Sequence, residues 1–342
     1  MSDIFETRTM IEALRQDHTT QTFLLDLLFS RSEPVDTETV DIDIVKGDER
    51  LAPFVAPVIE GKVMQSHATQ TRTYKPAYVK PKWATSASEI IAKRADGAAP
   101  YGGPSPEERA MLKLAEEIAA AENTIRRREE WMAAQALATG VIPVKGEGVD
   151  YVIDMGMSST HKIALSGTAL WSDAGSDPLG DIVGWVDLVA DDGDVNADVL
   201  ILGAKAADAL LKNEKIQKMF DVRNYALGTI NPVLTRPGAT WMGTIRASGV
   251  GIDVYRYTGS YRDENGVRRR MIADNAAILT STMADFRRNY GAIQDLKAGL
   301  MPMEIFVKSW EEEDPSVRYV LAQSAPLPAP HQIDAVVSAT VV

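Results

Sequence analysis

Apolar side chains recur at three- and four-residue spacing over residues 105–139, and this pattern predicts one long amphipathic helix. Ser105, Pro106 and Glu108 suit its first turn, and Gly140 suits the position after its last turn. At 1.5 Å per residue the helix would be roughly 50 Å long. We expect it to bury one narrow side and to leave most of its circumference to solvent or to another chain. The predicted apolar stripe consists of Met111, Leu114, Ile118, Ala121, Ile125 and Met132.

Strict alternation of apolar and polar residues predicts strands at residues 37–45, where Val40, Ile42 and Ile44 alternate with polar residues, and at residues 252–257. Residues 263–266 (DENG) predict a hairpin turn with positive φ at both central residues. Because strands and helices are mixed without a strict βαβ order, the fold class is predicted to be α+β. Further strands are expected at residues 149–155, 199–202 and 317–323, and further helices at 181–189, 204–211 and 214–219.

Two segments have a pattern that an ordinary core does not explain. Residues 1–35 contain a short amphipathic piece at 9–16 and an apolar patch at 23–29 that needs something to cover it. Residues 36–103 are poor in apolar side chains and rich in Pro and Gly. They are either a projecting arm that neighbouring chains order or a floppy insertion. Together with the one-sided helix, these segments favour a protein that assembles with partners.

Length and composition limit the class of protein and the kinds of site that the chain can have. With 342 residues the chain is long enough for about two domains. No apolar run reaches the roughly 18 residues of a membrane helix, and no signal peptide is expected at residues 1–6. The absence of cysteine excludes disulfides, thiolate metal sites and cysteine nucleophiles. A net charge of −12 disfavours nonspecific nucleic-acid binding, although a protein that only surrounds DNA needs no positive charge.

Motifs for catalysis or metal binding are weak. Residues 145–148 (KGEG) lack the spacing of a phosphate-binding loop and favour a hairpin turn. Residues 191–196 (DDGDVN) resemble a calcium loop, but the twelfth position is Leu202 instead of Glu, which favours a solvated loop. We therefore expect no catalytic residues, no cofactor and no metal.

Neither the histidines nor the arginine clusters form a recognisable site. His18, His67, His161 and His331 are not paired at helical metal spacing, and we expect them at the surface or at interfaces. The clusters at residues 126–128, 268–270 and 287–288 each lie near acidic residues. Local salt bridges or pairing between subunits are therefore favoured over phosphate binding.

Several short segments, in matching order over about residues 20–330, resemble the major capsid protein E family of lambda-like phages. Each segment is short, and their joint order and spacing carry the resemblance. They are residues 54–61 (FVAPVIEG), 78–82 (YVKPK), 154–156 (DMG), 166–168 (SGT), 171–172 (WS), 257–261 (YTGSY), 264–267 (ENGV), 274–275 (DN), 290–295 (YGAIQD) and 323–327 (QSAPL).

The resemblance implies the tailed-phage capsid fold of the Hong Kong 97 type. It assigns residues 1–35 to an N-terminal arm, and 36–103 to a region that carries an extended E-loop with its tip within 64–72. Residues 104–175 would form the peripheral P domain with a spine helix at 105–139. Residues 176–315 would form the axial A domain, and 316–342 would return to the P domain.

The same resemblance implies a structural protein, not an enzyme, that forms the hexamers and pentamers of an icosahedral head. Its partners would be other copies of itself, a portal protein, a scaffold during assembly and a candidate decoration protein at local three-fold positions. It would enclose double-stranded DNA without reading its sequence, contact no membrane, and belong to the virion after assembly in the bacterial cytoplasm. The residues expected at contacts between subunits are Phe23, Leu24, Leu27, Tyr74, Tyr78, Lys80, Pro81 and Lys82.

Two other functions are kept open. An encapsulin-type compartment would share the fold but would need an interior site for cargo. A hydrolase would need a pocket with convergent ionisable groups, and no such set is recognisable in the sequence.

Overall fold

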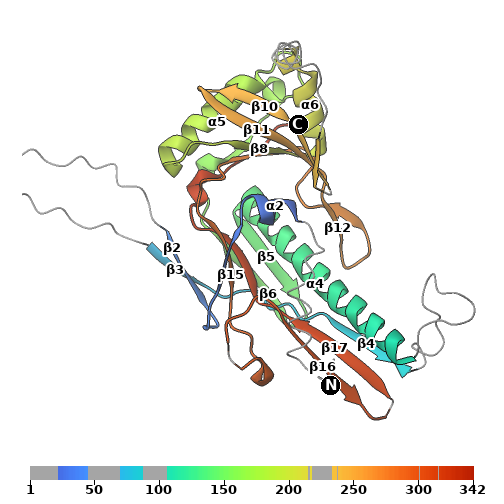
Figure 1. Cartoon of the computed structure of the whole chain (residues 1–342). Coiled ribbons are helices and arrows are strands. Elements are labelled where there is room, and N and C mark those ends of the chain that lie inside the picture. The colour runs from blue at the N-terminus through green and yellow to red at the C-terminus, as the bar shows by residue number, and fades with distance from the viewer. Residues whose placement is uncertain are drawn as a thin grey trace, which may run out of the picture.

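A computed structural model describes residues 22–44, 70–87, 106–214, 216–217, 233–236, 238–299, 301–314 and 316–342. The long helix α4 (Pro106–Thr139) runs diagonally through the lower part of the molecule, and a sheet-based unit with helices α5 and α6 lies above its C-terminal end (Figure 1). The predicted α+β class and the predicted long helix are both confirmed. The predicted cap at Ser105 lies outside the described residues.

Helix α4 is buried very differently along its length. In the N-terminal half, Leu114, Ile118 and Ala121 face inward and the other sides are largely exposed, as the stripe predicts. Met111 was expected in the stripe but is 44% exposed, because the apolar cluster on this face begins at Leu114. In the C-terminal half, alanines at several sides of the helix are also fully buried, so the prediction of a single narrow stripe is wrong there. Gly140 ends the helix with φ +68, and its N–H bonds to the Ala136 carbonyl at 3.0 Å, as a C′ glycine does.

A three-stranded antiparallel sheet packs along the N-terminal half of α4. Its strands are β16 (Phe306–Glu312), β17 (Val317–Gln323) and β4 (Lys82–Ser86), in that order. Val307, Val320 and Ala322 of this sheet meet Leu114 and Ile118 of the helix in one cluster. Strand β17 has the predicted bounds. Strand β16, which was expected to belong to the A domain, instead lies with β4 and β17.

A seven-stranded mixed sheet forms the core of the upper unit. Helix α5 (Pro178–Gly193) and helix α6 (Ala204–Lys212) pack with it in a second cluster. The last strand, β19, pairs with β14 in this sheet. Two strands of this sheet confirm the strands predicted at residues 199–202 and 252–257. In spatial order the strands are β7 (Lys162–Ala164), β19 (Val337–Thr340), β14 (Ala276–Thr280), β8 (Val199–Leu202), β11 (Val250–Tyr257), β10 (Ala239–Ala247) and β9 (Val233–Arg236).

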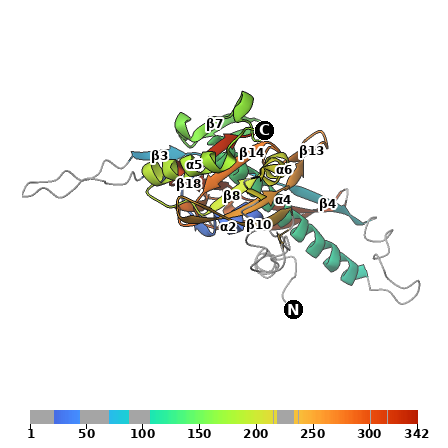
Figure 2. The same cartoon turned by 90° about the horizontal axis from the view of Figure 1, so that it is seen from above.

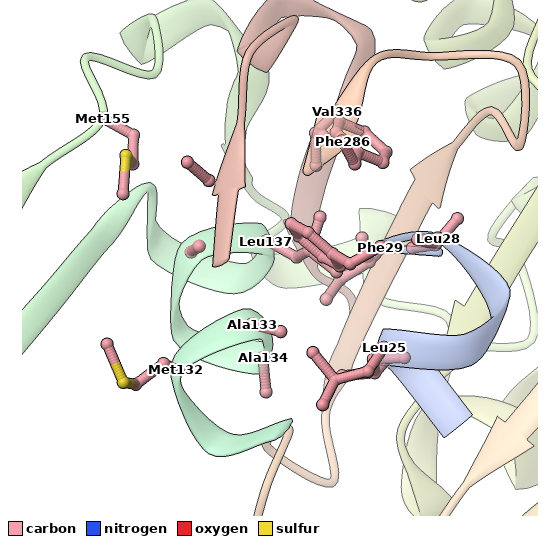
Figure 3. Packing of buried hydrophobic residues seen from close by; sticks show 14 of the residues in the cluster. Leu25, Leu28, Phe29, Met132, Ala133, Ala134, Leu137, Met155, Phe286 and Val336 are labelled. Atoms are coloured by element: carbon pink, nitrogen blue, oxygen red, sulfur yellow. The ribbon is translucent and has the colours of Figure 1, made fainter. Parts of the chain in front are cut away.

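The region between the two units contains the largest cluster of buried side chains among the described residues. Strands β1 (Arg31–Pro34), β15 (Phe286–Tyr290) and β18 (Pro326–Pro330) form a second three-stranded sheet there. The short helix α2 (Phe23–Leu27) lies across the C-terminal half of α4 (Figure 1). The rings of Phe29 and Phe286 stack with centroids 5.4 Å apart. Figure 3 shows both residues, with Leu137 of α4 beside Phe29. The apolar N-terminal patch is therefore covered by its own chain.

Three two-stranded ribbons complete the fold of the described residues. They are β2 (Val40–Ile44) with β3 (Gln70–Tyr74), β5 (Val141–Gly146) with β6 (Val149–Asp154), and β12 (Ser260–Arg262) with β13 (Arg268–Arg270). Residues 70–72 pair with β2 from Ile42 to Ile44, so the part of the range 64–72 that is described belongs to a strand. Residues 64–69 lie outside the described ranges, as do 54–61 of the resemblance.

Both predicted hairpin turns are present, but one differs in detail. Gly148 has φ +74 between β5 and β6, as expected for the turn at 145–148. In the turn after β12, Gly266 has φ +76 whereas Asn265 does not have positive φ. The reason is Asp263, whose side chain accepts hydrogen bonds from the N–H groups of Asn265 and Val267 at 3.0 and 2.9 Å. This favours a type I turn followed by a left-handed glycine.

Candidate assembly surfaces

Glu130 joins three separate parts of the chain. Its carboxylate accepts hydrogen bonds from the backbone N–H groups of Phe23, Leu24 and Leu25 at 2.9–3.1 Å, which are the unpaired donors of the first turn of α2. The hydroxyl of Tyr257 on β11 donates to the same carboxylate at 2.8 Å. Burial raises the pKa of Glu130, and the four donors partly offset that rise. The sequence offered no signal for this contact, since Glu130 reads there as one more charged residue of the helix.

A second buried network centres on Arg126. Its guanidinium donates to Glu129 at 3.0 Å, to the Tyr290 hydroxyl at 2.9 Å and to Glu304 at 2.6 Å. Burial alone would lower the pKa of Arg126, but the charges of Glu129 and Glu304 outweigh this effect and raise it. Ser32 of β1 donates to Glu304 at 2.5 Å, so the network also holds the N-terminal segment. Local pairing of this arginine cluster is thus confirmed for Arg126.

The first three residues expected at subunit contacts lie on α2. Phe23 and Leu24 are 3% and 0% exposed, and the Phe23 ring packs against Tyr255 and Tyr257 with centroids 5.2 and 5.4 Å apart. Phe23 and Leu24 were expected at a subunit contact because the apolar patch at 23–29 needs something to cover it. Other parts of the same chain cover both residues, so this reason does not hold. Leu27 is half-buried at the edge of the same cluster.

The other expected contact residues lie along the path from β3 to β4. The Tyr74 hydroxyl donates to the Asp154 carbonyl at 3.0 Å, at the base of the β2–β3 ribbon. Tyr78 donates to Gln323 at 3.1 Å, and Pro81 accepts from the Ala322 N–H at 3.1 Å. Lys80 and Lys82 are exposed; Lys80 lies 4.6 Å from the Tyr78 ring centroid and Lys82 lies 3.6 Å from that of Tyr319. The structure therefore brings Tyr78, Lys80, Pro81 and Lys82 together along β17, away from α2.

Large apolar side chains remain exposed on the single chain. Leu296 and Met301 are 91% and 64% exposed. Ala298, from the same short turn as Leu296, packs in a small cluster with Tyr78, so this apolar surface adjoins the Tyr78–Lys82 path. Isolated exposed apolar residues are ordinary, whereas apolar side chains grouped within a polar surround are typical of an interaction surface.

Candidate chemistry is sparse among the described residues. Within those ranges no group of three or more His, Asp or Glu is placed to hold a metal ion. His161 was expected at the surface or at an interface but is fully buried within its own chain, where its Nδ1 lies 2.9 Å from the Val336 carbonyl and its Nε2 lies 2.9 Å from Asp192. Asp192 lies near the end of α5, in the acidic run that resembles a calcium loop, and its carboxylate contacts His161. In the described part of the chain, no helix is both long and apolar enough to cross a membrane.

A long helix backed by a three-stranded sheet, a separate sheet-based unit and a β-ribbon at the edge define a structural shell protein with the Hong Kong 97-type capsid fold. The family model described as phage major capsid protein E matches residues 6–341. The chain belongs to this family, and its function is that of a capsid subunit.

Individual relatives agree with that assignment. The major capsid protein of Escherichia phage lambda is 28% identical over 332 residues, which is 95% of each chain. The major capsid protein of Enterobacteria phage P21 is 27% identical over 329 residues, again 95% of each chain. Among solved structures, a prophage capsid protein of Escherichia coli CFT073 superposes with a TM-score of 0.74 at 23% identity, covering 98% of this chain and 99% of the other. A phage-related protein of Bordetella bronchiseptica RB50 gives a TM-score of 0.54 at 12% identity and shares the fold, with 97% and 96% of the two chains covered.

Proposed function

We propose that copies of this chain form the hexamers and pentamers of an icosahedral head that encloses double-stranded DNA. The observation that carries the proposal is the exposed apolar group at Leu296 and Met301 beside the Tyr78–Lys82 path. Burial of apolar surface against a neighbouring subunit is favourable by roughly 25 cal/mol per Å². We keep six of the expected contact residues in this proposal: Leu27, Tyr74, Tyr78, Lys80, Pro81 and Lys82.

The β2–β3 ribbon supports the same proposal. It lies at the outer edge of the molecule in both views (Figures 1 and 2) and pairs with no other strand among the described residues. Its base is anchored, since Val40 and Ile42 are buried in the main cluster. An isolated two-stranded ribbon is marginally stable in water, so a ribbon that extends from the body gains order from a neighbouring chain. We assign it to the E-loop, which bridges slightly different subunit geometries in hexamers and pentamers.

The finer parts of the function follow from this assignment. The shell assembles as a procapsid in the cytoplasm of the host bacterium and expands as DNA enters. Its partners are a portal protein, a scaffold and a decoration protein at local three-fold positions. The chain acts mechanically and is not an enzyme, so neither a hydrolase nor an encapsulin-type compartment is needed to explain its surfaces.

The test is electron microscopy of the purified chain and of a variant that lacks residues 64–69. This deletion keeps β3 and its pairing with β2 intact. We expect hollow shells or capsomers from the full chain, and folded subunits without stable shells from the variant. A full chain that stays monomeric would overturn the proposed function, and unaltered shells from the variant would overturn the arm assignment alone.

A further inference from the structure

An open cleft of about 840 Å³ lies between the C-terminal half of α4, strand β5 and the β12–β13 hairpin. Figure 1 shows the hairpin beside α4, below the seven-stranded unit. Six cationic side chains line the cleft, and all of them are exposed. They are Arg127, Arg128, Lys145, Arg262, Arg268 and Arg269.

The acidic residues that follow these arginines in the sequence do not neutralise them. Glu129 and Glu130 are 1% and 3% exposed and face the opposite side of the helix, where Arg126 and the first turn of α2 hold them. Among the acids of the cleft, Asp263 is paired with Arg269 at 2.6 Å. Glu264 is then the one remaining acid beside five cations in the lining. On a chain of net charge −12, this is a local concentration of positive charge.

The cleft is also preorganised. Arg128 lies over the Trp131 ring, 5.2 Å from its centroid, and the Tyr261 ring meets Trp131 edge-on at 6.2 Å. These contacts orient the guanidinium group before any partner arrives. Guanidinium groups held in this way favour carboxylates as partners, because they can bind them with two parallel hydrogen bonds.

A surface of opposite charge lies on helix α5. Between Lys162 and Lys205 the sequence has eight aspartates and no Lys, Arg or Glu. Asp187 and Asp191 are one helical turn apart on α5 and both are exposed. Like charges at this spacing repel, and acids in the last turn of a helix oppose its dipole. Helix α5 has no basic residue in its last turn to offset this cost.

The two surfaces lie at opposite edges of the molecule. Both views place α5 on one side and the β12–β13 hairpin on the other (Figures 1 and 2). In a ring of identical subunits each contact joins one surface to a different surface, so opposite edges must be complementary. We propose that the basic cleft binds the acidic face of α5 of a second copy of this chain, as the head-to-tail contact within a capsomer. This inference rests on the proposed function, and it names the partner of one surface.

Reversing the charge on each side tests the contact. One variant carries R127E and R128E, and the other carries D187K and D191K. Each alone places like charges in contact, so we expect loss of capsomers in native mass spectrometry and of shells in electron microscopy. A chain with all four substitutions should assemble again. The control variant K205E/K212E makes the same change in net charge as R127E/R128E but on α6, outside the cleft, and should assemble normally.

Mixing the two reversed variants gives a sharper test. Each contact between unlike variants joins opposite charges, so only rings that alternate the two chains are favourable. Alternation closes a ring with an even number of subunits but not with an odd number. We therefore expect mixed hexamers and a loss of pentamers and closed shells.

The outcomes separate this inference from the proposed function. If the unmodified chain forms shells and both reversed variants also do, the contact is wrong although the capsid function holds. If the cleft variant assembles but loses binding of a short DNA duplex that the unmodified chain retains, the cleft is a phosphate site and the inference is overturned. Failure of the chain with all four substitutions to assemble, when it is folded by circular dichroism, would also overturn it.

Discussion

The hydroxyl of Tyr257 donates a hydrogen bond of 2.8 Å to the carboxylate of Glu130, although 127 positions separate the two residues. Tyr257 ends strand β11 of the seven-stranded unit, and Glu130 lies on helix α4, which belongs to the lower unit. Because the same carboxylate also binds the first turn of α2, one side chain connects both units and the N-terminal segment. Glu130 therefore links the two units beside the large apolar cluster that also joins them.

Replacing Glu130 should destabilise the subunit strongly. E130A leaves three backbone N–H groups and one hydroxyl without their acceptor in a buried place, which costs about 3–5 kcal/mol in the free energy of unfolding. Chemical denaturation of the unassembled chain measures this loss. E107Q, on the exposed first turn of the same helix, is the matched control and should change the stability by less than about 0.5 kcal/mol. Equal effects from the two substitutions would show that the Glu130 contacts carry no special weight.

The stability of the chain should also depend on pH through Glu130. Burial raises its pKa in the folded chain above the usual 4.5, so the folded chain binds this proton more tightly than the unfolded chain does. The stabilisation is complete below 4.5 and is lost as the pH rises through the raised native value. Above about pH 4.5 the free energy of unfolding should fall more steeply with pH for the unmodified chain than for E130Q, which has no titrating group at this position. Parallel curves would contradict the prediction.

Arg126 and Arg127 are neighbours with opposite environments, which makes them a matched pair. R126A removes the cation that neutralises Glu129, a fully buried acid, and should cost about 3–5 kcal/mol. R127A removes an exposed side chain of the cleft and should change subunit stability by about 0.5 kcal/mol or less. Thermal denaturation followed by circular dichroism compares them directly. A larger effect from R127A would contradict the assignment of the two environments.

The sequence predicted the elements whose pattern is local. Helix α4, strands β8 and β17 and the turn at Gly148 follow from periodicity and glycine alone. It did not predict the cover of the 23–29 patch, because Glu130, Tyr257 and Phe286 come from distant parts of the chain. Nor did it separate Arg126 from Arg127 and Arg128. Successive residues of a helix point in directions about 100° apart, so a cluster in sequence becomes one buried ion pair and two residues of a cleft.

The last prediction separates residues that stabilise the subunit from those that would join subunits. L24A opens a cavity in a fully buried cluster and should lower the stability of the unassembled chain by about 2–5 kcal/mol. K80A and K82A change exposed side chains, so the unassembled chain should unfold as before while shells form less readily or come apart at lower denaturant concentration. Denaturation of subunits and light scattering of shells, measured on the same variants, give the two readouts. If K80A and K82A leave shells unaltered, Lys80 and Lys82 do not join subunits. The Tyr78–Lys82 path then serves only contacts within the single chain, with β17.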